Sequence, residues 1–149
     1  MPLGTDFQTM AGLKVVEAKV LCSGGHHKAA FYLAGYALEF ALKAAVCKCL
    51  DMPDFFKEKQ KGTAGYVGGV LEKYKTHDIK TLIVLAGLYN KLEDYKTVNS
   101  DFGLAWYHIE NLNWSERCRY ELAGHSDIDV NKFVEGIETQ FLPWISQHW

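Results

Sequence analysis

The sequence has little proline, no strong excess of charge of either sign and no long hydrophobic run. Only three of the 149 residues are proline, whereas 48% are hydrophobic and 13% are aromatic, which excludes the disordered, collagen-like and low-complexity classes. The formal net charge of −2 is far from the basic balance typical of a nucleic-acid-binding domain. The length suits a domain that buries its own core without disulfides or metal ions. We therefore expect a single packed domain over residues 1–149.

The four cysteines match no metal-binding or redox motif. No two of them are spaced as Cys-x-x-Cys, and Cys47 and Cys49 would point about 200° apart on a helix. Free thiols in a reducing cytoplasm are the simplest interpretation, because the sequence does not open with a signal peptide. The longest apolar stretch, Ala29–Leu38, is about half as long as a membrane span requires. We expect a cytoplasmic protein without a membrane helix, a metal ion or a cofactor.

The first third of the chain shows helical spacing and no alternating strand pattern. A first helix is predicted from about Asp6 to Cys22, with Thr5 and Gln8 as a capping box. A second helix, from about His26 to Leu50, is the strongest, and its alanines together with Gly35 allow a neighbouring helix to approach closely. We expect the second helix to be central. The predicted apolar stripe of the first helix is Met10, Leu13, Val16, Val20 and Leu21.

The connection over residues 51–76 contains Pro53, a run of alternating charge and four glycines between positions 62 and 69. These glycines are more typical of a flexible connector than of a phosphate-binding loop, because no Gly-Lys-Ser or Gly-Lys-Thr follows them. A helix is predicted over Thr76–Asp94, with Thr76 or Asp78 at its start. Its predicted buried stripe is Ile79, Leu82, Ile83, Ala86 and Tyr89.

The last third contains one clear helix. A short helix around Leu104–Tyr107 is predicted first, and a segment from Trp114 to Leu122 follows it. Ser126 and Asp129 form a capping box for the final helix, which Pro143 should kink or end. Four or five amphipathic helices joined by turns predict an all-α, antiparallel up-and-down bundle. The stripe of the final helix is Val130, Phe133, Val134, Ile137, Phe141 and Ile145.

Glu39 lies in the middle of the most apolar helix, where a lone buried charge would be costly. Lys43 follows one turn later and could pair with it along the helix. Arg119 could instead reach it from far along the chain, with a planar guanidinium that holds a carboxylate through two bonds. We favour Arg119 as the partner, partly because of the resemblance described below.

Arg117, Arg119 and His125 form the one candidate set of catalytic residues. An arginine stabilises charge that develops on a phosphate and a histidine moves a proton near neutral pH, so these residue types suit cleavage of RNA by its own 2′-hydroxyl. On a straight helix Arg119 and His125 would lie about 120° apart, and Gly124 indicates that a helix ends before the histidine. The alternative interpretation is that the arginines pair with internal carboxylates and that the histidine lies in a loop.

Three segments carry recognisable motifs in a fixed order. Residues 27–45 read HKAAFYLAGYALEFALKAA, residues 76–82 read THDIKTL and residues 114–120 read WSERCRY. They are similar to the A-x-Y-L-A-G-Y-x-x-E-x-x-L-K, H-D-L-x-x-L and W-x-x-E-x-R-Y features of the HEPN (higher eukaryotes and prokaryotes nucleotide-binding) domain family. The order and spacing of the three motifs resemble the family over residues 10–145.

The resemblance implies a HEPN-like helical bundle, often a homodimer, that is frequently encoded with a minimal nucleotidyltransferase in toxin–antitoxin or stress-response systems. Many members are metal-independent ribonucleases with an Arg-x4–6-His motif, which Arg119 and His125 match with five intervening residues. Those members usually have a polar residue directly after the arginine, whereas this chain has Tyr120. Members with the W-x-x-E-x-R-Y feature look more like a non-catalytic or nucleotide-binding branch, in which Glu39 and Arg119 would tie two helices together.

The leading hypothesis is a cytoplasmic HEPN-like dimer that binds a nucleotide or a nucleotidyltransferase partner and does no chemistry itself. Glu39 and Arg119 would then form a structural or ligand-binding pair. The alternative is a ribonuclease toxin in which Arg119 and His125 meet at a dimer cleft and cut RNA without a metal. A third hypothesis is an assembly module that docks through its aromatic end, Trp144–Trp149. Supporting roles are expected for Lys43, Arg117, Tyr120 and His77.

Overall fold

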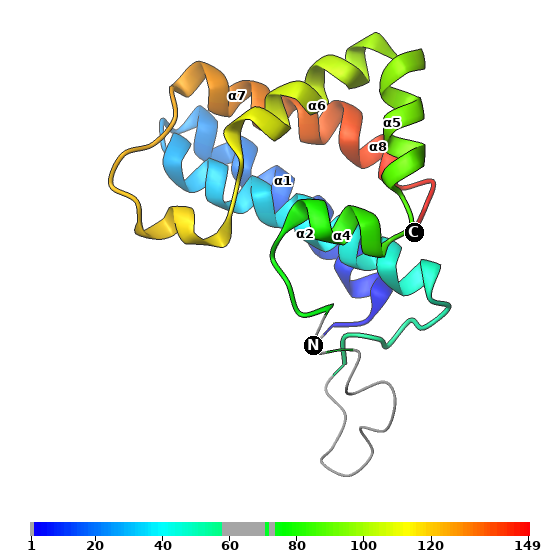
Figure 1. Cartoon of the computed structure of the whole chain (residues 1–149). Coiled ribbons are helices and arrows are strands. Elements are labelled where there is room, and N and C mark those ends of the chain that lie inside the picture. The colour runs from blue at the N-terminus through cyan, green and yellow to red at the C-terminus, as the bar shows by residue number, and fades with distance from the viewer. Residues whose placement is uncertain (1, 58–70, 72–73) are drawn as a thin grey trace.

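The computed structural model describes residues 2–57, 71 and 74–149, and the regular elements within these ranges are all helical. They are α1 (Gly4–Ser23), α2 (His27–Cys49), α4 (Ile79–Leu85), α5 (Tyr89–Val98), α6 (Ser100–Leu112), the 3-10 helix η1 (Glu116–Tyr120), α7 (Asp127–Gly136), the π-helical segment η2 (Ile137–Phe141) and α8 (Leu142–Ile145). Helix α2 contacts α1, α4, η1, α7, η2 and α8 and runs through the middle of the molecule (Figure 1). The predictions of an all-α fold and of a central second helix are therefore confirmed.

Helices α1 and α2 form a hairpin lined by small side chains. The turn between them places Gly25 at φ +81°, a left-handed conformation that suits glycine. Ala11 and Ala18 of α1 and Ala34 and Ala41 of α2 are completely buried. Because alanine carries a single methyl group, the two helices approach closely, as the sequence predicts.

Helix α1 buries a different face from the predicted one. Leu13, Val16 and Val20 of the expected stripe are 55%, 57% and 67% exposed. The face with two alanines packs closely on the alanines of α2, and the bulkier apolar side chains stay outside. The residues of α1 that are buried are Gly4, Phe7, Ala11, Val15 and Ala18.

The start of α1 is also fixed differently from the prediction, which placed a capping box at Thr5 and Gln8. The helix begins at Gly4, and the backbone N–H of Leu3 donates to Asp6 Oδ2 at 2.8 Å. The N–H of Gly4 donates to the carbonyl oxygen of Pro53 at 2.8 Å, which ties this end of α1 to the chain beyond α2.

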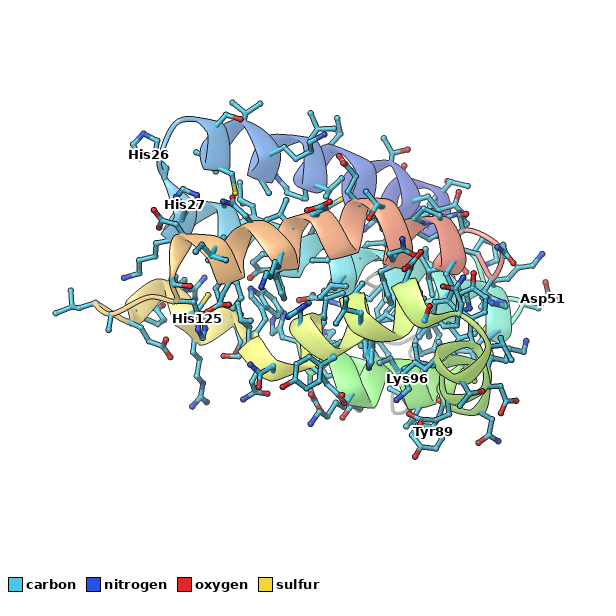
Figure 2. All side chains as sticks on the ribbon, turned by 90° about the horizontal axis from the view of Figure 1, so that it is seen from above. His26, His27, Asp51, Tyr89, Lys96 and His125 are labelled. Atoms are coloured by element: carbon cyan, nitrogen blue, oxygen red, sulfur yellow. The ribbon has the colours of Figure 1, made fainter. Side chains whose placement is uncertain are left out.

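The helix predicted over residues 76–94 is in fact two helices. Asp78 is the N-cap of α4, as predicted, and accepts from the N–H groups of Lys80 and Thr81. Gly87, at φ +68°, ends α4 in a Schellman motif, in which the N–H of Leu88 bonds to Ile83 O at 3.0 Å. Tyr89 then begins α5 and is 55% exposed, so its predicted burial is wrong (Figure 2). The predicted connection over residues 51–76, with its glycines at 62–69, lies largely outside the described residues.

Helix α6 is longer than the short helix predicted around Leu104–Tyr107. It begins after Asn99, whose side chain accepts from the N–H of Phe102 at 3.0 Å, and it ends at Asn113, which adopts a left-handed φ of +45°. Its buried residues lie at helical spacing and pack against α7 and η2. They are Phe102, Ala105, Trp106, Ile109 and Leu112.

The C-terminal helix follows the prediction up to Pro143. The N–H of Asp129 donates to Ser126 Oγ at 3.1 Å, which confirms the cap, and every residue of the predicted stripe is buried. Pro143 does not end the helix. Because proline has no backbone N–H, it cannot donate a hydrogen bond to the carbonyl group one turn earlier. The residues before it form the wider π-helical segment η2, and the chain then continues as α8. Trp144 is buried against Phe141, so it is a core residue rather than part of a free docking end.

Helix α2 is long and apolar enough, by length and composition alone, to span a membrane, which the sequence prediction did not anticipate. Within the described residues, 78% of its most apolar window is buried inside the domain.

Burial raises the pKa of the Cys47 and Cys118 thiols, so neither is an activated nucleophile. Cys49 is exposed.

Candidate functional site

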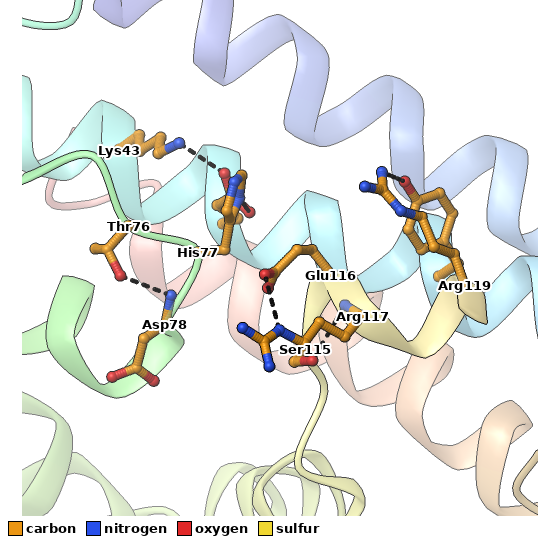
Figure 3. A network of polar contacts seen from close by, with 10 residues as sticks. Lys43, Thr76, His77, Asp78, Ser115, Glu116, Arg117 and Arg119 are labelled. Atoms are coloured by element: carbon orange, nitrogen blue, oxygen red, sulfur yellow. Dashed lines mark hydrogen bonds and ion pairs between the residues drawn. The ribbon is translucent and has the colours of Figure 1, made fainter. Parts of the chain in front are cut away.

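One side of α2 carries four side chains with polar groups in a row. Tyr32, Tyr36, Glu39 and Lys43 are separated by four, three and four positions, so they lie on the same face of the helix. We call these four residues the polar face of α2. Each end of the polar face bonds to a segment that is distant in the sequence, with His77 at one end and Arg119 at the other (Figure 3).

Glu39 is 1% exposed and is paired at both of its carboxylate oxygens. Lys43 Nζ donates to Oε1 at 2.6 Å and is itself almost buried, and Nδ1 of His77 lies 2.9 Å from Oε2. These contacts satisfy a carboxylate that would otherwise be costly to bury. The predicted ion pair between Glu39 and Arg119 is absent among the described residues, and that prediction is wrong. The local partner, Lys43, is the one that the fold uses.

His77 is held in place by a tight turn ahead of α4. The N–H of Asp78 donates to Thr76 Oγ1 at 3.0 Å, and the Asp78 carboxylate caps α4. The turn presents His77 to α2, where its ring meets the edge of Tyr36 at 6.3 Å between centroids. The side chain of His77 is 47% exposed, so one edge of the ring contacts buried Glu39 and the rest faces outward.

Arg119 lies on η1 and directs its charge to the surface. The 3-10 helix starts where the N–H of Arg117 donates to Ser115 Oγ at 3.2 Å. Arg119 Nη1 donates to Tyr32 Oη at 3.3 Å, and its Cζ lies 4.7 Å from the centroid of the Tyr120 ring. The hydrogen bond to Tyr32 is the main cause that raises the pKa of Arg119. In the described part of the chain no carboxylate forms an ion pair with this guanidinium.

The two tyrosines between Arg119 and His77 have opposite pKa shifts. Their rings pack edge to face at 5.1 Å between centroids. A hydrogen bond with Tyr36, and then one with Arg119, lower the pKa of Tyr32. Burial, and then the bond with Tyr32, raise the pKa of Tyr36 well above its usual range. Tyr32 is therefore the tyrosine better able to release a proton.

Trp114 supports the polar face from the side. Its ring lies 5.2 Å from that of Tyr36 between centroids, and it packs directly on Gly35. A Cβ at Gly35 would lie 1.9 Å from Cε2 of Trp114. The sequence prediction that Gly35 admits a neighbouring helix is therefore wrong, because the glycine admits an indole ring.

His125 belongs to a different surface from the polar face. It lies in the exposed loop before α7, and its ring meets the edge of Phe31 at 4.8 Å between centroids (Figure 2). Phe31 and Tyr32 are consecutive on α2 and point about 100° apart. His125 and Arg119 are thus anchored on diverging sides of the helix, and among the described residues they make contacts with different partners.

Arg117 and His27 make only weak contacts. Arg117 is 85% exposed at its side chain and lies 4.0 Å from Glu116, at the limit of an ion pair. Nδ1 of His27 lies 3.4 Å from Asp127 Oδ1 without hydrogen-bond alignment. Among the described residues, no three His, Cys, Asp or Glu side chains gather closely enough to hold a metal ion.

The arrangement combines an exposed cation, two phenolic hydroxyls and an imidazole oriented by a buried carboxylate. Such groups recognise a ligand with a phosphate and hydroxyl groups. Sequence reasoning named Glu39, Lys43, His77 and Arg119 but missed Tyr32 and Tyr36, although their helical spacing from Glu39 could have revealed them. Comparison with models of known protein families, with curated proteins and with solved structures found no match.

Proposed function

We propose that this protein is a HEPN-like helical module that binds a phosphate-bearing ligand, a nucleotide or RNA, at the polar face of α2. The observation that supports the proposal most directly is the exposure and the contacts of the Arg119 side chain. Its guanidinium is exposed, is steadied by Tyr32 and Tyr120, and forms no ion pair with a carboxylate in the described residues. A positioned arginine without an internal counter-ion is suited to an external anion.

The convergence of the three sequence motifs supports the HEPN-like part of the proposal. The motif on α2 meets the residue 76–82 motif through Glu39 and His77. It meets the residue 114–120 motif through Tyr32 and Arg119, and the same motif places Trp114 over Gly35. Segments up to 87 positions apart therefore share one site, as expected if they form a functional unit rather than three unrelated likenesses.

Calorimetric titration with nucleotides and with short single-stranded RNA tests ligand binding. Arg119→Ala should weaken the affinity at least about tenfold, because a charge-assisted contact to phosphate is lost. Arg117→Ala is the matched control, since it removes the same charge from the same 3-10 helix and should change the affinity by less than about threefold. Equal losses in the two variants, or no binding by the unmodified protein, would contradict the proposal.

The ribonuclease alternative needs Arg119 and His125 to act on one phosphate. Both side chains are exposed in the described structure, so a cleft between two copies could bring them together. This alternative requires cleavage of single-stranded RNA in the presence of a chelator, and loss of cleavage in His125→Ala without a change in melting temperature. Cleavage that persists in His125→Ala removes the alternative.

A homodimer and a nucleotidyltransferase partner stay predictions. The exposed apolar stripe Leu13, Val16 and Val20 on α1 supports a homodimer, because a self-complementary apolar patch is typical of a two-fold interface. Sedimentation analysis should give the mass of a dimer, and Val16→Glu should give that of a monomer. A monomer in the unmodified protein would contradict the prediction.

A further inference from the structure

The Glu39–His77 contact fixes more than the position of the imidazole ring. Glu39 is paired with Lys43 and is buried, so its carboxylate accepts hydrogen bonds there. The Nδ1 atom of a neutral His77 must therefore carry the proton and donate to Oε2, which lies 2.9 Å away. The lone pair of the neutral ring is then on Nε2.

The Nε2 atom is on the side of the ring that faces away from Glu39. The two ring nitrogens lie on different edges of an imidazole, and the His77 side chain is 47% exposed while Glu39 is 1% exposed. Among the described residues, no hydrogen bond to Nε2 is formed. The site thus offers an oriented hydrogen-bond acceptor at its surface, and its natural partner is a hydroxyl group.

Arg119 and His77 are bonded to residues that lie two turns apart on α2. Their anchors on α2, Tyr32 and Glu39, are seven residues apart, which is about 10 Å along the axis. Tyr36 lies between the anchors, and its ring touches those of Tyr32 and His77. A strand with alternating phosphate and ribose groups can place a phosphate at the cation and a sugar hydroxyl at the acceptor.

We propose that His77 determines sugar specificity, because its Nε2 accepts a hydrogen bond from a ribose 2′-hydroxyl of an RNA strand whose phosphate is held by Arg119. The 2′-hydroxyl is the group by which a protein distinguishes RNA from DNA. Glu39 and Lys43 are positioning residues that keep the acceptor pointing outward. This inference rests on the proposed phosphate-binding function and adds the class of strand that the same site selects.

Binding of a short RNA and of a DNA of equivalent sequence, measured by fluorescence anisotropy at slightly alkaline pH, tests the inference. The unmodified protein should bind RNA about tenfold more tightly than DNA, the value of one well-made hydrogen bond. His77→Phe keeps an aromatic ring beside Tyr36 but removes the acceptor, so RNA affinity should fall to that of DNA while DNA affinity stays unchanged. His108→Phe, on α6, is the matched control and should keep the preference.

The outcomes separate this inference from the proposed function. Arg119→Ala should weaken RNA and DNA alike, and its failure to do so would reject the phosphate site. Equal binding of RNA and DNA by the unmodified protein, or equal losses for both in His77→Phe, would overturn the role of His77 alone. Imidazole nitrogen NMR gives a second reading that needs no variant. A proton on Nδ1 of neutral His77 is expected, and a proton on Nε2 would contradict the inference.

Discussion

The two sides of α2 make different kinds of contact. The alanine side, with Ala34 and Ala41 completely buried, makes contacts that depend on shape and exclude water. The polar face from Tyr32 to Lys43 is bonded to Arg119 through Tyr32 and to His77 through Glu39, and these two partners are exposed. The core contacts and the proposed ligand-binding groups therefore share one helix and differ in which face each residue occupies.

The residues at and around the polar face also differ from one another in burial. Its inner part, Glu39 and Lys43, is buried and belongs energetically to the core. Its partners from other segments, Arg119 and the free edge of His77, are exposed and contribute little to folding. Substitutions of the inner part should reduce stability, and substitutions of these exposed partners should reduce binding.

Lys43→Met should give the largest effect, because it leaves one oxygen of buried Glu39 without a partner. A loss of about 3 kcal/mol in the free energy of unfolding is expected, measured by urea denaturation. Lys14→Ala is the control, since Lys14 pairs with Glu17 at 2.8 Å but both side chains are partly exposed, and it should cost less than about 0.5 kcal/mol. Similar losses in the two variants would show that burial does not distinguish these pairs.

Gly35→Ala should give the next largest effect. The new Cβ would lie 1.9 Å from the Trp114 ring, so the ring must move, at a cost of about 2 kcal/mol. Gly12→Ala in α1 has no atom within 4 Å of the new Cβ and should stabilise the protein by about 0.5 kcal/mol. Thermal melts of both variants check the opposite signs, and a stabilising Gly35→Ala would contradict the packing described for Trp114.

The two tyrosines of the polar face give a smaller effect that appears only at alkaline pH. Tyr32 should ionise below the usual pKa of about 10, and Tyr36 above it, because their pKa values are shifted down and up. The raised pKa of Tyr36 makes a contribution to stability that is present below about pH 10 and is lost as the pH rises further. In a spectrophotometric titration, Tyr32→Phe should remove the early component. Tyr36→Phe should remove the late component and also move the early one toward the usual tyrosine pKa, because the bond with Tyr36 is the main cause that lowers the pKa of Tyr32.

The same titration tests the contact between Tyr32 and Arg119. Arg119→Ala should move the early component toward the usual tyrosine pKa, because Arg119 contributes to the lowering of the Tyr32 pKa. Arg117→Ala should leave the titration unchanged. If Arg119→Ala also leaves it unchanged, the Arg119–Tyr32 contact does not form in solution.

The sequence predicts the elements whose signals are local and strong. The α2 boundaries agree with the predicted helix to within one residue at each end, and the Ser126 cap and the stripe of the final helix are confirmed. These features depend on helix propensity, a side-chain cap and regular spacing, which neighbouring residues determine. The break at Gly87 and the face that α1 buries depend on packing against other helices, and the sequence reasoning missed both.

The sequence reasoning named the charged residues and the histidine of the candidate site, but it missed the two tyrosines and the pairing. Glu39 and Arg119 both take part, yet Glu39 binds Lys43 and His77 while Arg119 binds Tyr32. The residue type shows that a buried carboxylate needs a cation. Only the three-dimensional course of the chain decides which of two candidate cations lies beside it. The turn before α4 brings His77 to Glu39. The helix η1 instead brings Arg119 to Tyr32, which precedes Glu39 by seven residues on α2.

Chemical-shift mapping by NMR, with a short single-stranded RNA added in steps, tests the central claim most directly. The account predicts that the largest shifts occur at Tyr32, Tyr36, His77 and Arg119, with small shifts at the alanine side of α2 and in α5. Shifts centred on His125 or on the exposed stripe of α1, or no shifts at all, would contradict the claim that the polar face of α2 is the binding site.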